Sequence, residues 1–154
     1  MMEDMMTVQA DNSVAEASPT AGLPDLTATS AFLAGVGLVL EEVGGTKVTG
    51  HVELGPEHHT PWGVVHGGVY ATIAESVASI GASAAVLGQG QSAVGVNNST
   101  DFLRSVRSGR VDVIAEPVFQ GRVQQLWQVT MRRSEDGKDV ARCTMRLQNL
   151  PLNR

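Results

Sequence analysis

Residues 62–87 read WGVVHGGVYATIAESVASIGASAAVL, and their periodicity constrains the architecture more than any other part of the chain. The apolar residues recur at intervals of four and three, at Val69, Ile73, Val77, Ile80, Ala84 and Leu87. Such spacing places one apolar stripe along a helix, so the stretch predicts a helix of about 20 residues and about 30 Å. Gly88-Gln89-Gly90 follows, and glycine in this position commonly ends a helix.

Strand patterns lie on both sides of this helix. Before it, residues 31–42 predict a short turn of helix running into a strand, and residues 47–54 alternate like a half-buried strand. After it come four strand-like runs, joined by short turn-prone connections that indicate an antiparallel meander: residues 92–102, 109–120, 123–133 and 139–150. The order predicts an α+β fold in which an antiparallel sheet wraps around one long central helix. The uncovered face and edges of that sheet predict a homo-oligomer.

Length, composition and charge narrow the class of protein. The 154 residues suit one domain, assigned to residues 31–154, while residues 1–30 are acidic and predict a disordered N-terminal tail. A net charge of −5 argues against a nucleic-acid-binding protein. His66 and Glu75 argue against a membrane span over residues 66–87. The single Cys143 and a start without a basic, apolar signal predict a cytoplasmic protein.

Glu75 is the most informative residue of the predicted helix. It is the only Asp, Glu, Lys or Arg between Glu57 and Asp101, and no basic residue lies three or four positions away from it. A carboxylate withdrawn from water without a cation costs several kcal/mol, and proteins commonly retain such a group where it has chemistry to perform. The alternative is an exposed glutamate on the solvent face of an ordinary helix.

His66-Gly67-Gly68 precedes the helix and suggests a site for a developing negative charge. The first N–H groups of a helix lack internal partners, and two glycines let a ligand approach them closely. Such an N–H could bind the oxyanion formed when a thioester carbonyl is attacked, although a plain glycine turn before a helix has the same sequence. Glu75 lies about 13.5 Å along the axis from His66, so one helix cannot bring both to one carbonyl. Two antiparallel copies can, which predicts a composite site at a dimer interface.

The segment 62–76 resembles the signature of hotdog-fold thioesterases of the phenylacetate-pathway type. It is especially similar to 4-hydroxybenzoyl-CoA thioesterases of the Arthrobacter kind and to 1,4-dihydroxy-2-naphthoyl-CoA thioesterases. The resemblance covers roughly residues 45–150, with further matching stretches at residues 94–98, 102–105, 109–111 and 126–129. It implies the hotdog fold and hydrolysis of a CoA thioester without metal or redox cofactor.

The resemblance also implies catalytic roles for four residues. Glu75 matches the catalytic carboxylate, which acts as nucleophile or as general base on water. Gly67 matches the residue whose N–H polarises the thioester carbonyl, and His66 matches the motif histidine that orients the loop or the thioester. Ser79 falls where related enzymes keep a Ser or Thr that positions the water or the carboxylate.

Substrate-binding residues are predicted around the same motif. Thr60 stands where close relatives carry a Gln that contacts the reacting group, so its role is in question, and the neighbouring His59 is a candidate substitute. Gly68 would let the substrate approach the backbone. Arg104 and Arg107 belong to a turn with three arginines that suits CoA phosphates, although a solvated turn is the alternative.

The leading hypothesis is therefore a cytoplasmic acyl-CoA thioesterase that acts as a homodimer or a dimer of dimers. Aryl-CoA substrates such as hydroxybenzoyl- or dihydroxynaphthoyl-CoA are favoured by the resemblance. Three alternatives remain: a short- or medium-chain fatty acyl-CoA thioesterase, a hotdog dehydratase, and a non-catalytic acyl-CoA-binding domain. We expect no metal, because no Cys or carboxylate completes a tetrahedral ligand set with the loop histidines.

Overall fold

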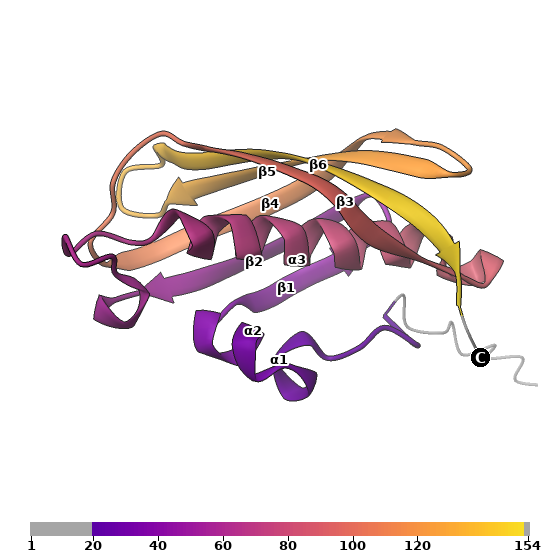
Figure 1. Ribbon diagram of the computed structural model, residues 1–154, viewed down its shortest axis with the longest axis horizontal. Coiled ribbons are helices and arrows are strands. Elements are labelled where there is room, and N and C mark those ends of the chain that lie inside the picture. The colour runs from indigo at the N-terminus through magenta and orange to yellow at the C-terminus, as the bar shows by residue number, and fades with distance from the viewer. Residues whose placement is uncertain (1–19, 153–154) are drawn as a thin grey trace, which may run out of the picture.

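The computed structural model describes residues 20–152 and shows one antiparallel sheet curved over a single long helix, as predicted (Figure 1). The sheet has six strands in the order β1-β2-β4-β5-β6-β3. The helices and strands are α1 (Leu26–Thr29), α2 (Ala31–Val36), β1 (Val39–Gly44), β2 (Lys47–Leu54), η1 (Pro56–His58), α3 (Gly67–Val86), η2 (Leu87–Gln89), β3 (Gln91–Phe102), β4 (Gly109–Gln120), β5 (Gln124–Arg133) and β6 (Asp139–Pro151).

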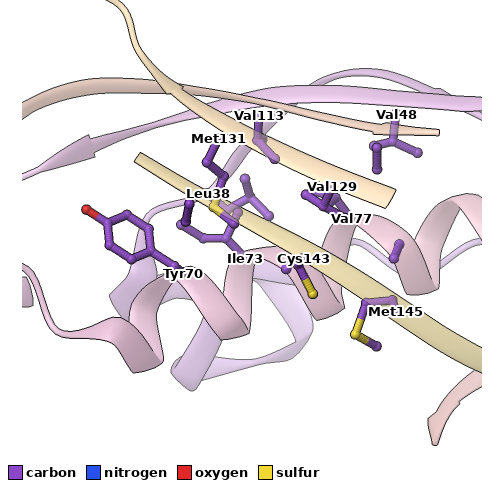
Figure 2. Close-up of a cluster of buried hydrophobic side chains, with 14 of the residues drawn as sticks. Leu38, Val48, Tyr70, Ile73, Val77, Val113, Val129, Met131, Cys143 and Met145 are labelled. Atoms are coloured by element: carbon purple, nitrogen blue, oxygen red, sulfur yellow. The ribbon is translucent and has the colours of Figure 1, made fainter. Parts of the chain in front are cut away.

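Helix α3 forms the centre of the core and contacts all six strands. Its apolar face is fully buried at Ile73, Ala74 and Val77 (Figure 2). The predicted end is also correct, since η2 follows and Gly90 adopts the left-handed conformation with φ 70°. By length and composition this helix could cross a membrane. Its packing against the sheet instead makes it the core helix of the fold.

The strands bury the faces that their alternation predicted. Val111, Val113 and Ala115 of β4 point into the core, and Trp127, Val129 and Met131 of β5 lie beside them. Strand β6 contributes Ala141, Cys143, Met145 and Leu147. Period-two patterning therefore located the inner face of the sheet correctly.

One part of the predicted topology is wrong. A meander would place β3 next to β4, whereas β3 pairs with β6 and forms the opposite edge of the sheet. Residues 103–108 connect the two strands across the end of the sheet, where the N–H of Leu103 donates to the carbonyl of Val140 at 2.8 Å. Val106 of this connection is buried and anchors it to the core, so a short linker that looked like a hairpin turn serves as a crossover.

The segment before β1 packs beside the core. Of the tail predicted over residues 1–30, residues 1–19 lie outside the described residues, whereas residues 20–30 form a turn followed by α1. Asp25 caps α1 by accepting hydrogen bonds from the N–H groups of Thr27 and Ala28, and the latter is the main reason why the pKa of Asp25 lies below its ordinary value. Leu23 and Leu26 pack against the core from outside.

Candidate active site

Glu75 lies on the side of α3 that faces away from the buried stripe. It is exposed in the single chain, although its sequence context suggested a carboxylate withdrawn from water. The difference arises because α3 directs Ile73, Ala74 and Val77 to the strands and leaves Glu75 on the open side. Among residues 20–152, no ion pair or hydrogen bond joins its carboxylate to another group.

A pocket of about 460 Å³ opens beside Glu75. One wall is the hydroxyl-bearing face of α3, and the facing wall is apolar and comes from the segment that holds α1 and α2. Ser79, one helical turn after Glu75, lines the same pocket, and its hydroxyl has no hydrogen-bond partner within the described part of the chain. The fold thus brings Glu75 and Ser79 to one cavity.

Strand β3 approaches Glu75 at a glycine. A Cβ at Gly95 would lie 3.6 Å from Oε1 of Glu75 and 3.2 Å from the terminal methyl of Met145. Directly after Gly95, the pairing with β6 shifts by one residue, which marks a β-bulge at Val96. Bulges are common beside active sites, where they redirect a strand.

His66 caps the start of α3. Its Nδ1 accepts a hydrogen bond from the N–H of Gly68 at 2.8 Å, so the proton of the neutral ring lies on Nε2. This bond occupies the Gly68 donor, whereas the N–H of Gly67 has no acceptor among the described residues. Gly67 therefore offers the free donor at the positively polarised end of the helix, and Gly68 does not.

Gly67 and Glu75 line different cavities within one chain. Gly67 borders a smaller cavity of about 250 Å³ together with Tyr70, Phe102 and Arg104. The Phe102 ring lies over Gly67, where a Cβ would come within 2.5 Å of a ring carbon. The helical rise from Gly67 to Glu75 is about 12 Å, so the two groups of one chain do not meet at one carbonyl.

The loop before α3 holds the other predicted substrate-binding residues. The Thr60 hydroxyl accepts from the N–H of Trp62 at 3.3 Å, and Nε2 of His59 lies 2.5 Å from the carbonyl oxygen of Arg107. The Arg107 guanidinium donates to the carbonyl of Gly63 at 3.4 Å. These residues stabilise one another and do not line the pocket beside Glu75.

Comparison with known proteins places the chain in a family. Residues 63–140 match the model of the family described as "Thioesterase superfamily". A Mycobacterium tuberculosis protein named "Putative esterase Rv1847" is 45% identical over 135 residues, which cover 86% of this chain and 95% of that protein. The chain belongs to the thioesterase superfamily.

Similar structures and a plant relative agree with this assignment. The solved structure of the same M. tuberculosis protein has a TM-score of 0.77 and 43% identity, covering 81% of this chain and 100% of that one. A Haemophilus influenzae thioesterase has a TM-score of 0.75 and 30% identity, covering 84% and 88%. The 1,4-dihydroxy-2-naphthoyl-CoA thioesterase 2 of Arabidopsis thaliana is 36% identical over 102 residues, 65% of this chain and 63% of that protein. The hotdog resemblance is confirmed, and the chain is a hydrolase acting on thioester bonds.

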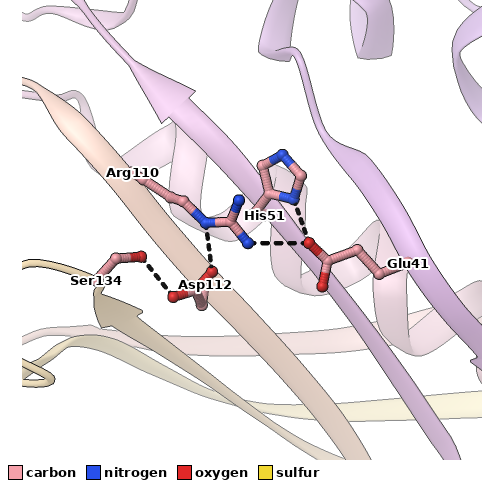
Figure 3. Close-up of polar contacts among 5 residues, drawn as sticks. All are labelled: Glu41, His51, Arg110, Asp112 and Ser134. Carbon is pink, nitrogen blue, oxygen red and sulfur yellow. Dashed lines mark hydrogen bonds and ion pairs between the residues drawn. The ribbon is translucent and has the colours of Figure 1, made fainter.

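The side chains of the three arginines in the turn at residues 104–110 lie in different places in this thioesterase. Arg104 donates to the carbonyl of Asp139 at 2.6 Å and borders the cavity at Gly67, and Arg107 stays at the loop. Arg110 instead points to the outer face of the sheet, where it donates to Asp112 at 2.8 Å and to Glu41 at 3.0 Å (Figure 3). Only Arg104 and Arg107 therefore lie near the loop and the start of α3.

The outer-face network of Arg110 is separate from the candidate site. Nδ1 of His51 lies 2.5 Å from Glu41, and Ser134 donates a hydrogen bond to Asp112 (Figure 3). Burial would raise the pKa of Asp112, but the hydrogen bonds from Ser134 and Arg110 hold it below its ordinary value. Ser134 bonds to the acid and not to the histidine, so these residues do not form a nucleophilic triad.

The surroundings of Cys143 do not favour a role as nucleophile in this thioesterase. Cys143 is buried in the core, its thiol donates to Asn98 at 3.3 Å, and burial raises its pKa, as suits a core residue better than a nucleophile. Within residues 20–152, no group of three or more His, Cys, Asp or Glu side chains could hold a metal ion.

Sequence reasoning missed two features of the site. It gave no role to Phe102, which covers Gly67, or to the apolar wall that residues 23–33 place opposite Glu75. Both result from contacts between residues distant in sequence. The one available signal for the wall was its run of apolar residues within an otherwise polar N-terminal region.

Proposed function

We propose that this thioesterase is an acyl-CoA thioesterase that releases a free acid and CoA with Glu75 as its catalytic carboxylate. The observation that carries the proposal is a carboxylate at a pocket of about 460 Å³ that has no ion-pair or hydrogen-bond partner among residues 20–152, with the hydroxyl of Ser79, equally without a partner there, in the same pocket. The pocket has room for an acyl group, and no ion pair among residues 20–152 occupies the carboxylate.

The mechanism follows from the separate places of Glu75 and Gly67. As general base, Glu75 takes a proton from water while the water oxygen attacks the thioester carbonyl. As nucleophile, it forms an anhydride that water then hydrolyses. The N–H of Gly67 from a partner subunit stabilises the oxyanion, His66 holds the loop, and Ser79 positions the water or the carboxylate. The CoA thiolate leaves as the tetrahedral intermediate collapses and takes up a proton from solvent.

The partner subunit is proposed from the unequal edges of the sheet. Strand β1 is short, contains a bulge and carries two glutamates, which are features that protect an edge. Strand β3 has 12 residues, exposes Val94 and Val96, and carries a single charge at Asp101. Two copies joined at β3 by a two-fold axis have antiparallel α3 helices, so Glu75 of each faces the Gly67 end of the other. This dimer is the minimal unit, and a dimer of dimers is compatible with it.

The acyl group is proposed to be an aryl group. Hydroxyls on one wall and apolar side chains on the other suit a flat ring with a polar substituent, as in hydroxybenzoyl- or dihydroxynaphthoyl-CoA. A short or medium fatty acyl chain, the alternative, would contact the apolar wall but would not use the hydroxyls.

Arg104 and Arg107 are proposed to bind the CoA phosphates. A cytoplasmic location is proposed as well, and it suits the free thiol of Cys143.

Replacing Glu75 tests this function. Glu75→Gln keeps the shape but removes the base, so we expect kcat to fall by at least about a hundredfold with an unchanged circular dichroism spectrum. Thiol release with DTNB is measured on benzoyl-, dihydroxynaphthoyl- and octanoyl-CoA. Glu116→Gln, an exposed glutamate on β4, is the matched control and keeps full activity.

Three outcomes would contradict parts of the proposal. Hydrolysis by Glu75→Gln at a near-wild-type rate removes the mechanism. Saturable binding of the esters by wild type without thiol release favours a non-catalytic binding domain. Hydration of crotonyl-CoA without thioester cleavage favours a dehydratase.

A further inference from the structure

The pocket beside Glu75 has an unusual second wall. The side with Glu75 comes from α3, but the facing side is built by residues 23–33, which lie more than forty positions before Glu75 in the chain. Leu23, Leu26, Phe32 and Leu33 direct apolar surface into the pocket from this segment. In Figure 1, α1 and α2 lie below α3 and beside β1. The boundary of the pocket opposite the carboxylate is therefore the N-terminal segment.

This wall stands between two cavities. The pocket beside Glu75 has about 460 Å³, and a second pocket of about 590 Å³ lies between the same segment and β1. Leu23 and Leu26 line both pockets. Protein interiors are otherwise close-packed, so a wall with space on both sides can change position at low cost.

The hydrogen bonds of the wall are local. Within the described part of the chain, those of residues 25–33 stay within the segment or reach only the next helical turn, through the caps at Asp25 and Ser30. One firm link to the rest of the fold follows at the end of α2, where Nε2 of the buried His58 donates to the carbonyl of Val36 at 2.9 Å. Among the described residues, residues 25–33 are thus held against the rest of the fold mainly by apolar contacts, with the His58 bond just after them.

We infer that residues 23–33 determine which acyl groups the enzyme accepts, with Phe32 as the main size-limiting side chain. The inference rests on the proposed function, because it assigns the acyl group to the pocket that holds Glu75. Phe32 is suited to this role because it lines the pocket and is 68% exposed, so its ring is not needed for the core. Ser76 lines the same pocket from α3, and among the described residues its hydroxyl donates only to the carbonyl of Thr72 in its own helix.

Two substitutions of opposite effect test the inference. Phe32→Ala enlarges the pocket and Ser76→Leu fills it. Both variants keep Glu75, Ser79 and Gly67 unchanged. We measure kcat/KM for benzoyl-, 2-naphthoyl-, octanoyl- and dodecanoyl-CoA. One methylene in an apolar pocket commonly changes specificity by about tenfold or more. The preference for the larger over the smaller ester should rise about tenfold in Phe32→Ala and fall about tenfold in Ser76→Leu.

A matched control and a second readout separate the possible failures. Phe119→Ala removes another exposed phenylalanine, at 61% exposure, from strand β4, no residue of which lines the pocket, and it should leave the size preference unchanged. The same preference is measured as a ratio of dissociation constants by calorimetry in a Glu75→Gln background. Unchanged ratios in both pocket variants overturn the inference. A wild-type chain that binds these esters but cleaves none overturns the proposed function alone, since the binding ratios still test the wall.

Discussion

At the scale of single residues, the buried hydroxyl of Tyr70 lowers the free energy of unfolding. Its side chain is 2% exposed, and its hydroxyl has no hydrogen-bond partner among the described residues. A buried hydroxyl without a partner costs about 1–3 kcal/mol. We expect Tyr70→Phe to raise the free energy of unfolding by an amount in this range, measured by urea denaturation at neutral pH. A less stable variant would show that the hydroxyl is satisfied by an ordered water.

Tyr70→Phe should also change how the stability of the protein depends on pH in alkaline solution. Burial raises the pKa of Tyr70 from 10 to about 12, so the folded protein keeps the phenolic proton at pH values where the unfolded chain has lost it. The stabilising effect of that proton is complete below pH 10 and disappears as the pH rises through about 12. The wild type should therefore lose about 2–3 kcal/mol more than Tyr70→Phe over this interval. Parallel pH profiles of the two proteins would contradict the burial effect.

Single residues also show what local spacing can and cannot indicate, and the catalytic role of Glu75 stays a prediction. Glu75 could be selected from the sequence because it is the only charge in a long apolar stretch and because helical neighbours are fixed by spacing. The commitment of the Gly68 N–H to His66 could not be predicted, since it depends on one side-chain rotamer. The close approach of Phe102 to Gly67 could not be predicted either, because the two residues belong to different elements and local spacing does not relate them.

At the scale of elements, the packing of α3 on the sheet depends on Gly81. A Cβ there would lie 2.6 Å from the Trp127 ring and 2.8 Å from a methyl of Val48. Trp127 is fully buried and donates to Gln125 at 2.9 Å, so it has little freedom to move. Gly81→Ala gains up to about 1 kcal/mol of helix propensity but overpacks the core, at a cost of about 1–3 kcal/mol. We expect a net loss of stability, seen as a lower Tm.

A second glycine provides the control for this prediction. Gly88 lies in η2, and a Cβ added there would have no atom of the described residues within 4 Å, so Gly88→Ala should leave Tm unchanged or raise it slightly. Equal Tm values for Gly81→Ala and wild type would show that the sheet can move away from α3 at that point.

Element boundaries were more predictable than element neighbours. Strands β2 and β4 begin and end at the predicted residues, because alternation and turn residues are local signals. The position of β3 at the far edge was not predicted, because residues 103–108 have the composition of a turn and the length of a short crossover. The α1–α2 wall could likewise not be predicted, because it becomes part of the pocket only through its position opposite α3.

At the scale of the whole molecule, the proposed active site needs two chains. Glu75 and Gly67 belong to one rigid helix and line separate cavities, so the distance between them is set by helical rise and not by a flexible loop. This is why a composite site could be predicted from the sequence. The edge proposed for pairing could not be chosen from the sequence, because the sequence did not place β3 at the edge of the sheet.

Subunit complementation tests the composite site directly. Glu75→Gln disables the carboxylate, and Gly67→Pro removes the N–H donor at the first helical position, where proline is well tolerated. The backbone of His66, with ψ 132°, already suits a following proline, and the exposed Phe102 can move away from the new ring. Each variant alone should be nearly inactive. A heterodimer purified through two different affinity tags carries one site with both groups intact, so it should show about half of the wild-type activity. If both groups acted within one chain, every site of the heterodimer would lack one of them, and the purified heterodimer would be as inactive as its parents.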